Sequence, residues 1–288
     1  MRLEAECYPC MMAQAFRAAA LSGLEGEDLK EVMRETAAFL EKVDPSWSPP
    51  ETAAVFYDRV KELSGVEDPF HALKEESNEK ALALLPRLRE EMANAPDPLS
   101  YALRAAIAGN IIDFGAHADP GDLEENIHRV QSEQPFIDHT EELRGDLAAA
   151  SSALLICDNA GEIVLDRLLC EVISSLYPGL DLTAAVRGGP AINDAMLADA
   201  QQSGLDSVCP VITTGLAMAG IDLERCSAEF REAFSSADVI VAKGQGNFET
   251  LDGRDENIYF LFQVKCDCVS GFLAAEKGAA VIWSLRHR

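Results

Sequence analysis

The spacing of apolar residues changes near residue 150 of the chain. Before that point apolar residues recur at intervals of three and four, which predicts amphipathic helices. Breaks rich in Pro and Asp, such as "DPSWSPP" and "NAPDP", separate these segments. We expect helices over 11–24, 27–43, 50–65, 71–92 and 99–115. Residues 1–150 are therefore predicted to form an all-helical N-terminal domain.

Residues 151–288 follow a second pattern, in which short β-rich runs alternate with helical segments. Strands are expected within 151–158, 181–188, 207–213, 237–244 and 279–285. Helices between successive strands are typical of parallel βαβ units. We therefore predict an α/β domain, a Rossmann-like three-layer α/β/α sandwich with a mainly parallel sheet. In such sheets ligands bind beyond the carboxyl ends of the strands, which is where candidate chemistry is sought.

The net charge of the chain limits the kinds of partner that the protein can bind. Asp and Glu outnumber Lys and Arg by 49 to 24, giving a formal net charge of −25. Such a field repels nucleic acids and anionic membranes, so an anionic ligand would need a locally basic or metal-bearing pocket. The apolar runs are too short to span a bilayer, and the N-terminus lacks the apolar core of a signal peptide. We therefore expect a cytoplasmic protein that binds neither nucleic acid nor membrane.

Two acid–amide pairs follow predicted strands. Asp158 and Asn159 end the first strand of the α/β half, and their oxygens suit Mg²⁺, Mn²⁺ or similar ions. Asn159 with Glu162 three residues later also resembles a capping box, so a helix cap is the alternative. Asn193 and Asp194 precede a later helix and could likewise cap it. Adjacent strand ends could instead bring Asp158 and Asp194 together around one ion.

Two cationic candidates stand near other strand ends. Arg187 precedes "GGPAINDAM" and could pair with an anion. Lys243 begins "KGQGNFET", in which Gly244 and Gly246 leave backbone N–H groups free to bind phosphate oxygens. No Ser or Thr follows as in a Walker motif, so an ordinary loop is the alternative.

The helical half holds one further candidate, "AAIAGNIIDFGAHAD". Asn110 and Asp113 lie there among apolar residues. A buried acid needs a partner, so a structural hydrogen bond and a site role are both open.

Two pairs of closely spaced cysteines suggest an alternative kind of site, built from thiolates. Cys7 and Cys10 have CxxC spacing, and Cys266 and Cys268 have CxC spacing. Four thiolates could bind zinc, and a CxxC alone could be redox-active. The CxC spacing is atypical of zinc sites, so reduced structural cysteines remain the other interpretation.

The motifs "ECYPC", "GNIIDFG", "CDNAGE", "GGPAINDA", "KGQGNFET" and "VKCD" occur in this order. As an ordered set covering nearly the whole chain, they resemble the DUF89 family of metal-dependent damage-control phosphatases, in its stand-alone prokaryotic branch. The resemblance implies hydrolysis of small phosphorylated metabolites, damaged or surplus, such as sugar phosphates or phosphopantetheine-like compounds. It implies a divalent ion, Mn²⁺, Co²⁺, Ni²⁺ or Mg²⁺. The oligomeric state is not indicated.

The resemblance also implies site residues. The metal ligands would be Asp158, Asn159 and Asp194, with Lys243 and Gly244 against the substrate phosphate. The attacking group would be a metal-bound water, which we favour, or Asp158 acting as a nucleophile. Further candidates for binding the phosphate or the substrate are Asn110, Asp113, Glu162, Arg187, Asn193, Gly246, Asn247 and Lys265.

Two other functions stay open at this point. An S-adenosylmethionine-dependent carboxyl methyltransferase would suit a Rossmann-like sheet, and some relatives have been described in that way. Against it, "CDNAGE" is a poor glycine-rich cofactor loop, and methyl transfer needs no paired acids. A non-enzymatic thiol- or metal-binding protein would instead use Cys7, Cys10, Cys266 and Cys268.

Overall fold

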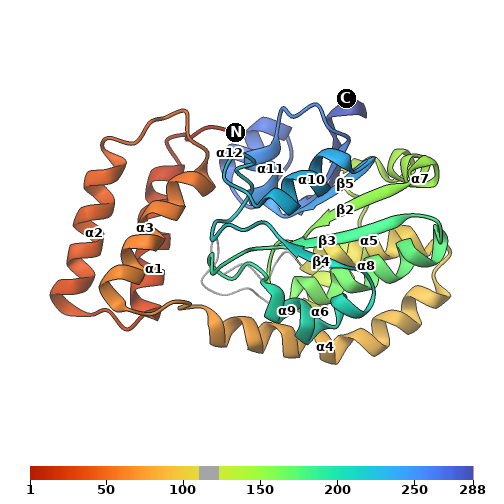
Figure 1. Cartoon of the computed structure of the whole chain (residues 1–288), viewed down its shortest axis with the longest axis horizontal. Coiled ribbons are helices and arrows are strands. Elements are labelled where there is room, and N and C mark those ends of the chain that lie inside the picture. The colour runs from red at the N-terminus through yellow and green to blue at the C-terminus, as the bar shows by residue number, and fades with distance from the viewer. Residues whose placement is uncertain (110–122, 288) are drawn as a thin grey trace.

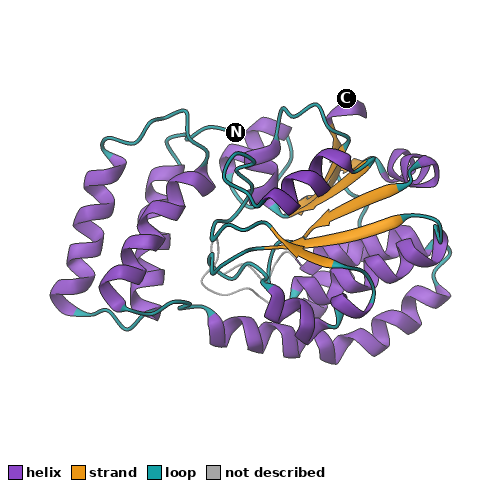
Figure 2. Ribbon diagram, viewed as in Figure 1, coloured by secondary structure: helices purple, strands orange, loops and turns teal. Residues whose placement is uncertain are grey.

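The computed structural model describes residues 1–109 and 123–287, and its strands form one sheet flanked by helices (Figure 1, Figure 2). The helices are α1 Cys7–Leu21, α2 Gly26–Leu40, α3 Pro49–Ser64, α4 His71–Asn94, α5 Pro98–Ala108, α6 Leu123–Ser132, α7 Thr140–Ala149, α8 Glu162–Leu176, α9 Leu197–Ser203, α10 Ala228–Ser236, α11 Gln245–Leu251 and α12 Asp267–Leu273. The strands are β1 Ile137–Asp138, β2 Ser152–Ile156, β3 Asp181–Val186, β4 Val211–Thr213, β5 Val239–Lys243, β6 Ile258–Gln263 and β7 Ala280–Ser284. None of the helices in these two ranges has the length and apolar character that a membrane span requires.

The sheet has the order β1-β7-β6-β5-β2-β3-β4. All neighbouring strands run parallel except β6 and β7, which are antiparallel. Strand β2 lies between β5 and β3, with Leu155 beside Val241 on one side and Ala184 on the other. The predicted α/β class with a mainly parallel sheet is confirmed. Because β5, β2 and β3 are parallel neighbours, the segments that follow them emerge at one edge of the sheet.

Each face of the sheet has its own apolar core. Helices α4 to α9 contribute to the core on one face, which includes Leu103, Leu165 and Leu155. Helices α10 to α12 contribute to the core on the other face, which includes Phe248 and Phe260. These two helical layers enclose the sheet in Figure 1. The result is the three-layer α/β/α arrangement.

A third core joins α1, α2 and α3, which stand together at one side of the sheet (Figure 1). It includes Met11, Val32 and Phe56. Helices α4 to α7 belong instead to the core of the sheet. The third core is thus centred on α1–α3 but also contacts Leu73, Ile192 and Cys268, whereas the sequence pattern put the domain boundary at residue 150. That residue marks the change from mostly helical to alternating sequence and does not mark the end of a core.

The elements differ from the sequence-based expectations in a few places. Strand β6 was not among the predicted strands, although its six residues are all buried, as are the five residues of the predicted strand β5. Strand β1 and helices α6 and α7 also lie in the half that was predicted as five helices. The helix expected over 99–115 ends as α5 at Ala108, and 110–115 lies outside the described residues.

Candidate active site

The segments that follow β2 and β3 pair with one another at the edge of the sheet. Asn159 and Asp194 form an isolated antiparallel bridge. Next to it, the Ala195 N–H donates to the Asp158 carbonyl at 2.7 Å, and the Ala160 N–H donates to the carbonyl of Asn193 at 2.8 Å. Four residues predicted to share one strand edge are therefore neighbours.

The helix-cap interpretation does not describe these residues. Helix α8 has Gly161 at its N-cap, and no side chain caps it. The Asn159 side chain donates instead, from Nδ2 to Asp158 Oδ2 at 3.0 Å and to Glu162 Oε2 at 3.5 Å. Helix α9 begins after Met196, two residues beyond Asp194. The two acid–amide pairs are thus left available for another role.

The carboxylates at this edge lie in a place that disfavours negative charge. Asp158 is only 6% exposed and Asp194 only 3%. Burial, followed by the charges of Asp194 and Glu162, raises the pKa of Asp158 well above its ordinary value. Lys265 and Arg187 act in the opposite direction without reversing the shift. At Asp158, burial and the neighbouring acids therefore outweigh the nearby basic groups, and a divalent cation would add positive charge there.

Gly244 shapes the space around Asp158. Its φ of 79° lies in the region that favours glycine, and a β-carbon there would stand 1.8 Å from Asp158 Oδ2. The missing side chain thus makes the room in which the carboxylate lies. Carboxylate and amide oxygens suit hard divalent ions, so Asp158, Asn159 and Asp194 fit such an ion by their chemistry. Within 1–109 and 123–287, no three or more His, Cys, Asp or Glu side chains are placed to hold an ion, and the fit described here is that of two carboxylates and one amide.

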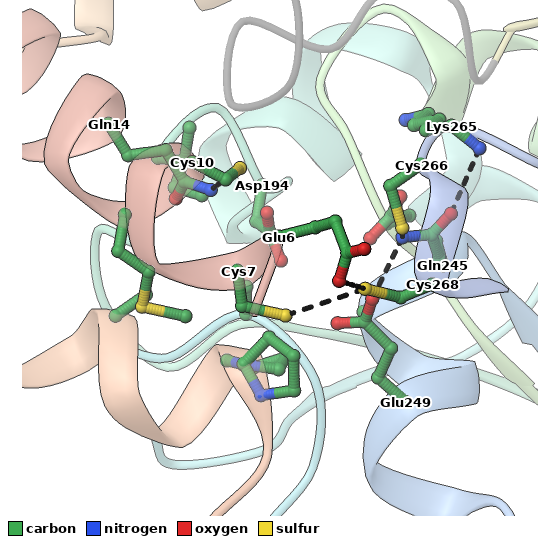
Figure 3. A pocket seen from close by; sticks show the side chains of 18 of the residues that line it. Glu6, Cys7, Cys10, Gln14, Asp194, Gln245, Glu249, Lys265, Cys266 and Cys268 are labelled. Carbon is green, nitrogen blue, oxygen red and sulfur yellow. Dashed lines mark hydrogen bonds between the residues drawn. The ribbon is translucent and has the colours of Figure 1, made fainter. Parts of the chain in front are cut away.

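A pocket of about 150 Å³ opens over these residues (Figure 3). Asp158, Asn159 and Asp194 line it from the sheet edge. The first helix and the start of α3 line it from the opposite side, so the N-terminal helices form part of the pocket wall. The other lining residues are Glu6, Cys7, Cys10, Met11, Gln14, Pro49, Pro50, Ala53, Ile192, Ala219, Gln245, Gly246, Glu249, Lys265, Cys266 and Cys268.

The two lysines of the sequence motifs lie in different places. Lys265 is the one basic side chain among the described residues that line the pocket. Lys243 is fully buried and donates from Nζ to Glu162 Oε1 at 2.5 Å, Asp166 Oδ1 at 2.6 Å and the Ala106 carbonyl at 2.9 Å. Burial opposes the Lys243 charge, but Asp166 and Glu162 outweigh it and raise the pKa. Lys243 was expected against the phosphate; the structure places it behind the pocket.

Arg187 also lies behind the pocket, where its guanidinium contacts protein groups. It is 1% exposed and donates from Nε to Asp194 Oδ2 at 2.6 Å, from Nη1 to the Gly220 carbonyl at 3.0 Å and from Nη2 to Asn247 Oδ1 at 3.0 Å. Asn247 is itself held by a bond from Nδ2 to the Lys243 carbonyl at 2.6 Å. Arg187 and Asn247 thus support Asp194, whereas the sequence analysis expected them at the substrate.

The remaining candidates divide between buried, pocket-lining and undescribed positions. Glu162 and Asn193 are buried beside the acid–amide pairs, and Gly246 lines the pocket. Asn110 and Asp113 lie outside the described residues. Their predicted roles stay predictions.

The four cysteines of the thiolate alternative all line the pocket but are not arranged as a tetrathiolate site. Cys7 Sγ lies 3.8 Å from Cys268 Sγ. Cys10 Sγ accepts from Gln14 Nε2, and Cys266 Sγ accepts from Gln245 Nε2, both at 3.3 Å. Burial raises the pKa of the Cys7 and Cys266 thiols, which favours the neutral form. Within the described chain the thiols therefore contribute to the pocket wall.

Sequence reasoning missed Asp166, the second carboxylate at Lys243. It follows Glu162 by four residues on α8, and residues at that spacing share one helix face. The four-residue spacing of Glu162 and Asp166, with apolar residues between them, was a signal that could have identified it. Gln245 and Glu249, joined by a bond from Gln245 Nε2 to Glu249 Oε1 at 2.8 Å, carried no comparable signal.

Comparison with known proteins finds relatives that match nearly the whole chain. The chain is 34% identical over 283 residues to a damage-control phosphatase of Pyrococcus horikoshii, covering 98% of this chain and 97% of the relative. It is 30% identical over 287 residues to a damage-control phosphatase of Archaeoglobus fulgidus, covering 98% of each. An uncharacterized protein of Methanocaldococcus jannaschii is 36% identical over 298 residues, covering 98% of this chain and 95% of the relative.

A solved structure extends the similarity to three dimensions. The crystal structure of a DUF89 family protein from Pyrococcus horikoshii matches with a TM-score of 0.89 and 34% identity, covering 99% of both chains. The model of the damage-control phosphatase ARMT1-like domain matches residues 3–281. The resemblance that the ordered motifs indicated is thereby confirmed, and the chain belongs to the damage-control phosphatase ARMT1-like (DUF89) family.

Proposed function

We propose that this protein is a divalent-metal-dependent phosphatase that hydrolyses phosphate monoesters of small metabolites. One observation carries the proposal beyond family membership. The two buried acids and the amide at the ends of β2 and β3 face the same pocket as Lys265. A phosphate monoester needs positive charge on its oxygens, and this pocket offers a place for a cation beside a lysine.

Asp158, Asn159 and Asp194 are the proposed metal residues. When bound, the divalent ion would supply positive charge for the phosphoryl oxygens and acidify a water molecule. Mn²⁺, Co²⁺, Ni²⁺ and Mg²⁺ all accept such oxygen ligands. Lys265 would contact the phosphate directly, because its side chain lines the pocket whereas Lys243 and Arg187 lie behind it.

Asp158 is proposed as a ligand and not as a nucleophile. Its Oδ2 accepts from Asn159 Nδ2 at 3.0 Å, and its carboxylate fills the space left by the absent side chain of Gly244. A carboxylate held from two sides has little freedom to approach phosphorus. Water is therefore the proposed attacking group.

The part of the substrate beyond the phosphate would contact the N-terminal helices. Met11, Pro49 and Pro50 provide apolar surface there, and Gln14 provides a polar group. A pocket of about 150 Å³ favours a small remainder, such as the sugar of a sugar phosphate.

Turnover of p-nitrophenyl phosphate and a sugar-phosphate panel tests the proposal. We expect hydrolysis with Mn²⁺ or Co²⁺ and its loss in chelator, with Asp158→Ala and Asp194→Ala inactive but folded. Chelator-resistant turnover would contradict the metal dependence, and no turnover across the panel would contradict the activity. Calorimetry with S-adenosylmethionine tests the methyltransferase alternative, and binding with a sub-millimolar dissociation constant would support it.

Elemental analysis separates the oxygen-ligand site from a thiolate site. Metal content should survive in a Cys7→Ser/Cys10→Ser variant and disappear in Asp158→Ala. The reverse result would assign the ion to the cysteines.

A further inference from the structure

A buried network of charged groups lies directly behind the proposed metal residues. Lys243 is the last residue of β5, and Glu162 and Asp166 stand one turn apart on α8. All three side chains are 0% exposed. Lys243 Nζ contacts Glu162 Oε1 at 2.5 Å, Asp166 Oδ1 at 2.6 Å and the Ala106 carbonyl near the end of α5 at 2.9 Å. The ammonium group is thus fixed by three different oxygens.

The network reaches the pocket through Glu162. While Oε1 of Glu162 accepts from Lys243, Oε2 accepts from Asn159 Nδ2 at 3.5 Å. Asn159 Nδ2 also donates to Asp158 Oδ2 at 3.0 Å. Two carboxylates therefore hold the NH₂ end of one amide.

The direction of this amide decides whether Asn159 can bind a cation. The carboxamide oxygen is an acceptor and can act as a metal ligand, whereas the NH₂ group is only a donor. With its NH₂ group held by Asp158 and Glu162, the end of Asn159 left for a cation is Oδ1. Groups behind a ligand commonly fix its orientation in this way.

We propose that Lys243 is a positioning residue, which holds Glu162 so that Glu162 turns the Asn159 carboxamide oxygen toward the metal ion. This inference rests on the metal assignment in the proposed function. It gives Lys243 no contact with the substrate. A buried carboxylate without a counter-charge is costly, so removing Lys243 would release Glu162 from this arrangement. Asp166 and the Ala106 carbonyl fix the position of the ammonium.

Neighbouring packing restricts the network to one arrangement. A β-carbon on Gly109 would stand 3.1 Å from both Cα and Cγ of Glu162, so the end of α5 lies directly against that residue. Gln263 Nε2 donates to the adjacent Ile107 carbonyl at 3.1 Å. Lys243 and Gln263 therefore both satisfy carbonyls in the last turn of α5, where a positive charge is favoured.

Manganese binding by the metal-free protein tests the proposal without relying on turnover. Free Mn²⁺ is counted by its electron paramagnetic resonance signal while full-length protein is titrated. In Lys243→Met, we expect the Mn²⁺ dissociation constant to rise about 10- to 100-fold, the usual cost of losing an orienting group behind a ligand. At saturating Mn²⁺, the dissociation constant of inorganic phosphate, measured by calorimetry, should stay within about two-fold of wild type, since the proposal gives Lys243 no contact with phosphate.

Two variants serve as comparisons. Lys265→Met should give the opposite pattern, weaker binding of inorganic phosphate with unchanged Mn²⁺ affinity, because Lys265 lines the pocket. Lys74→Met removes another buried lysine, whose Nζ lies 2.6 Å from Asp68 Oδ2. It should leave both constants unchanged and thereby control for the loss of a buried ion pair.

Unchanged Mn²⁺ affinity in folded Lys243→Met overturns the proposal. A ten-fold rise in the dissociation constant of phosphate, with unchanged Mn²⁺ affinity, also overturns it. If Lys243→Met does not fold, Glu162→Gln replaces it. A glutamine places an NH₂ group, which cannot accept, where one of the two Glu162 oxygens accepts from Lys243 or Asn159. Mn²⁺ affinity should therefore again fall, and an unchanged affinity would contradict the proposal. A protein that shows this Mn²⁺ pattern but hydrolyses no phosphate ester would refute the proposed function and leave this inference standing.

Discussion

Gly244 and Asp158 occupy one space at the edge of the sheet, since a β-carbon on residue 244 would stand 1.8 Å from Asp158 Oδ2. Gly244→Ala should therefore displace the carboxylate, which cannot share that volume with a methyl group. We expect kcat/KM for p-nitrophenyl phosphate to fall by about 100-fold or more, a loss typical of a misplaced group in an active site. Steady-state kinetics at several Mn²⁺ concentrations measure the effect.

Gly253→Ala is the matched control for that substitution. Gly253 also has a positive φ, 87°, but no atom lies within 4 Å of the position of its β-carbon. It carries the backbone strain of alanine at positive φ without the overlap. Activity in Gly253→Ala should stay close to wild type, and an equal loss in both variants would assign the effect to backbone strain.

Asp158 and Asp194 should differ in their effect on stability without metal. Burial and the charges of Asp194 and Glu162 raise the pKa of Asp158, so ionising this carboxyl costs more free energy in the folded protein than in the unfolded chain. Asp158→Asn should raise the free energy of unfolding in chelator by about 1 to 3 kcal/mol. Asp194→Asn should lower it, because Asp194 Oδ2 pairs with buried Arg187 at 2.6 Å.

Urea unfolding of the two variants and wild type in chelator measures this contrast. Both variants should bind Mn²⁺ poorly, so the stability difference is independent of the metal. Equal destabilisation by the two substitutions would show that Asp158 is not strained by its neighbours.

The sequence predicted the neighbourhood of Asp158 and Asp194 because that neighbourhood follows from topology. Consecutive parallel strands present their carboxyl ends at one edge, and β2 and β3 pair in that way. The direction of the Lys243 side chain could not be predicted by the same reasoning. It depends on the face of β5 on which residue 243 lies and on partners 77 and 137 residues distant, Asp166 and Ala106.

Local sequence patterns also could not predict which helices form the pocket wall. Amphipathic spacing predicts that 11–24 is helical, and α1 does cover Cys7–Leu21. It does not say that the start of this helix lies across from Asp194, as Figure 3 shows. That placement depends on tertiary contacts such as Cys7 Sγ with Cys268 Sγ, which join segments 261 residues apart.

Asp166 should make stability depend on pH. Burial, only partly offset by Lys243, raises the pKa of Asp166 from its ordinary 3.8 to about 7. Between about pH 4 and about pH 7 the folded protein therefore keeps a proton that the unfolded chain has lost, and this contribution to stability declines as pH rises. The stability of wild type relative to Asp166→Asn should fall by about 2 kcal/mol from about pH 5 to about pH 7. Urea unfolding in chelator across that range measures it, and a difference that grows with pH would contradict the assignment.

Cys10 offers a test of the role of α1 in substrate binding. It is the one exposed cysteine of the described chain, and it lines the pocket across from Lys265. A bulky maleimide on its thiol would occupy pocket volume on the α1 side. We expect KM for sugar phosphates to rise at least about ten-fold after labelling, with the Mn²⁺ dissociation constant unchanged, because binding energy outside the reacting centre is lost.

Cys10→Ser is the control, because it keeps a hydrogen-bond acceptor for Gln14 and should be active and resistant to the reagent. Full activity of the labelled wild type, with modification of Cys10 verified by mass spectrometry, would mean that the α1 side of the pocket does not contact substrate.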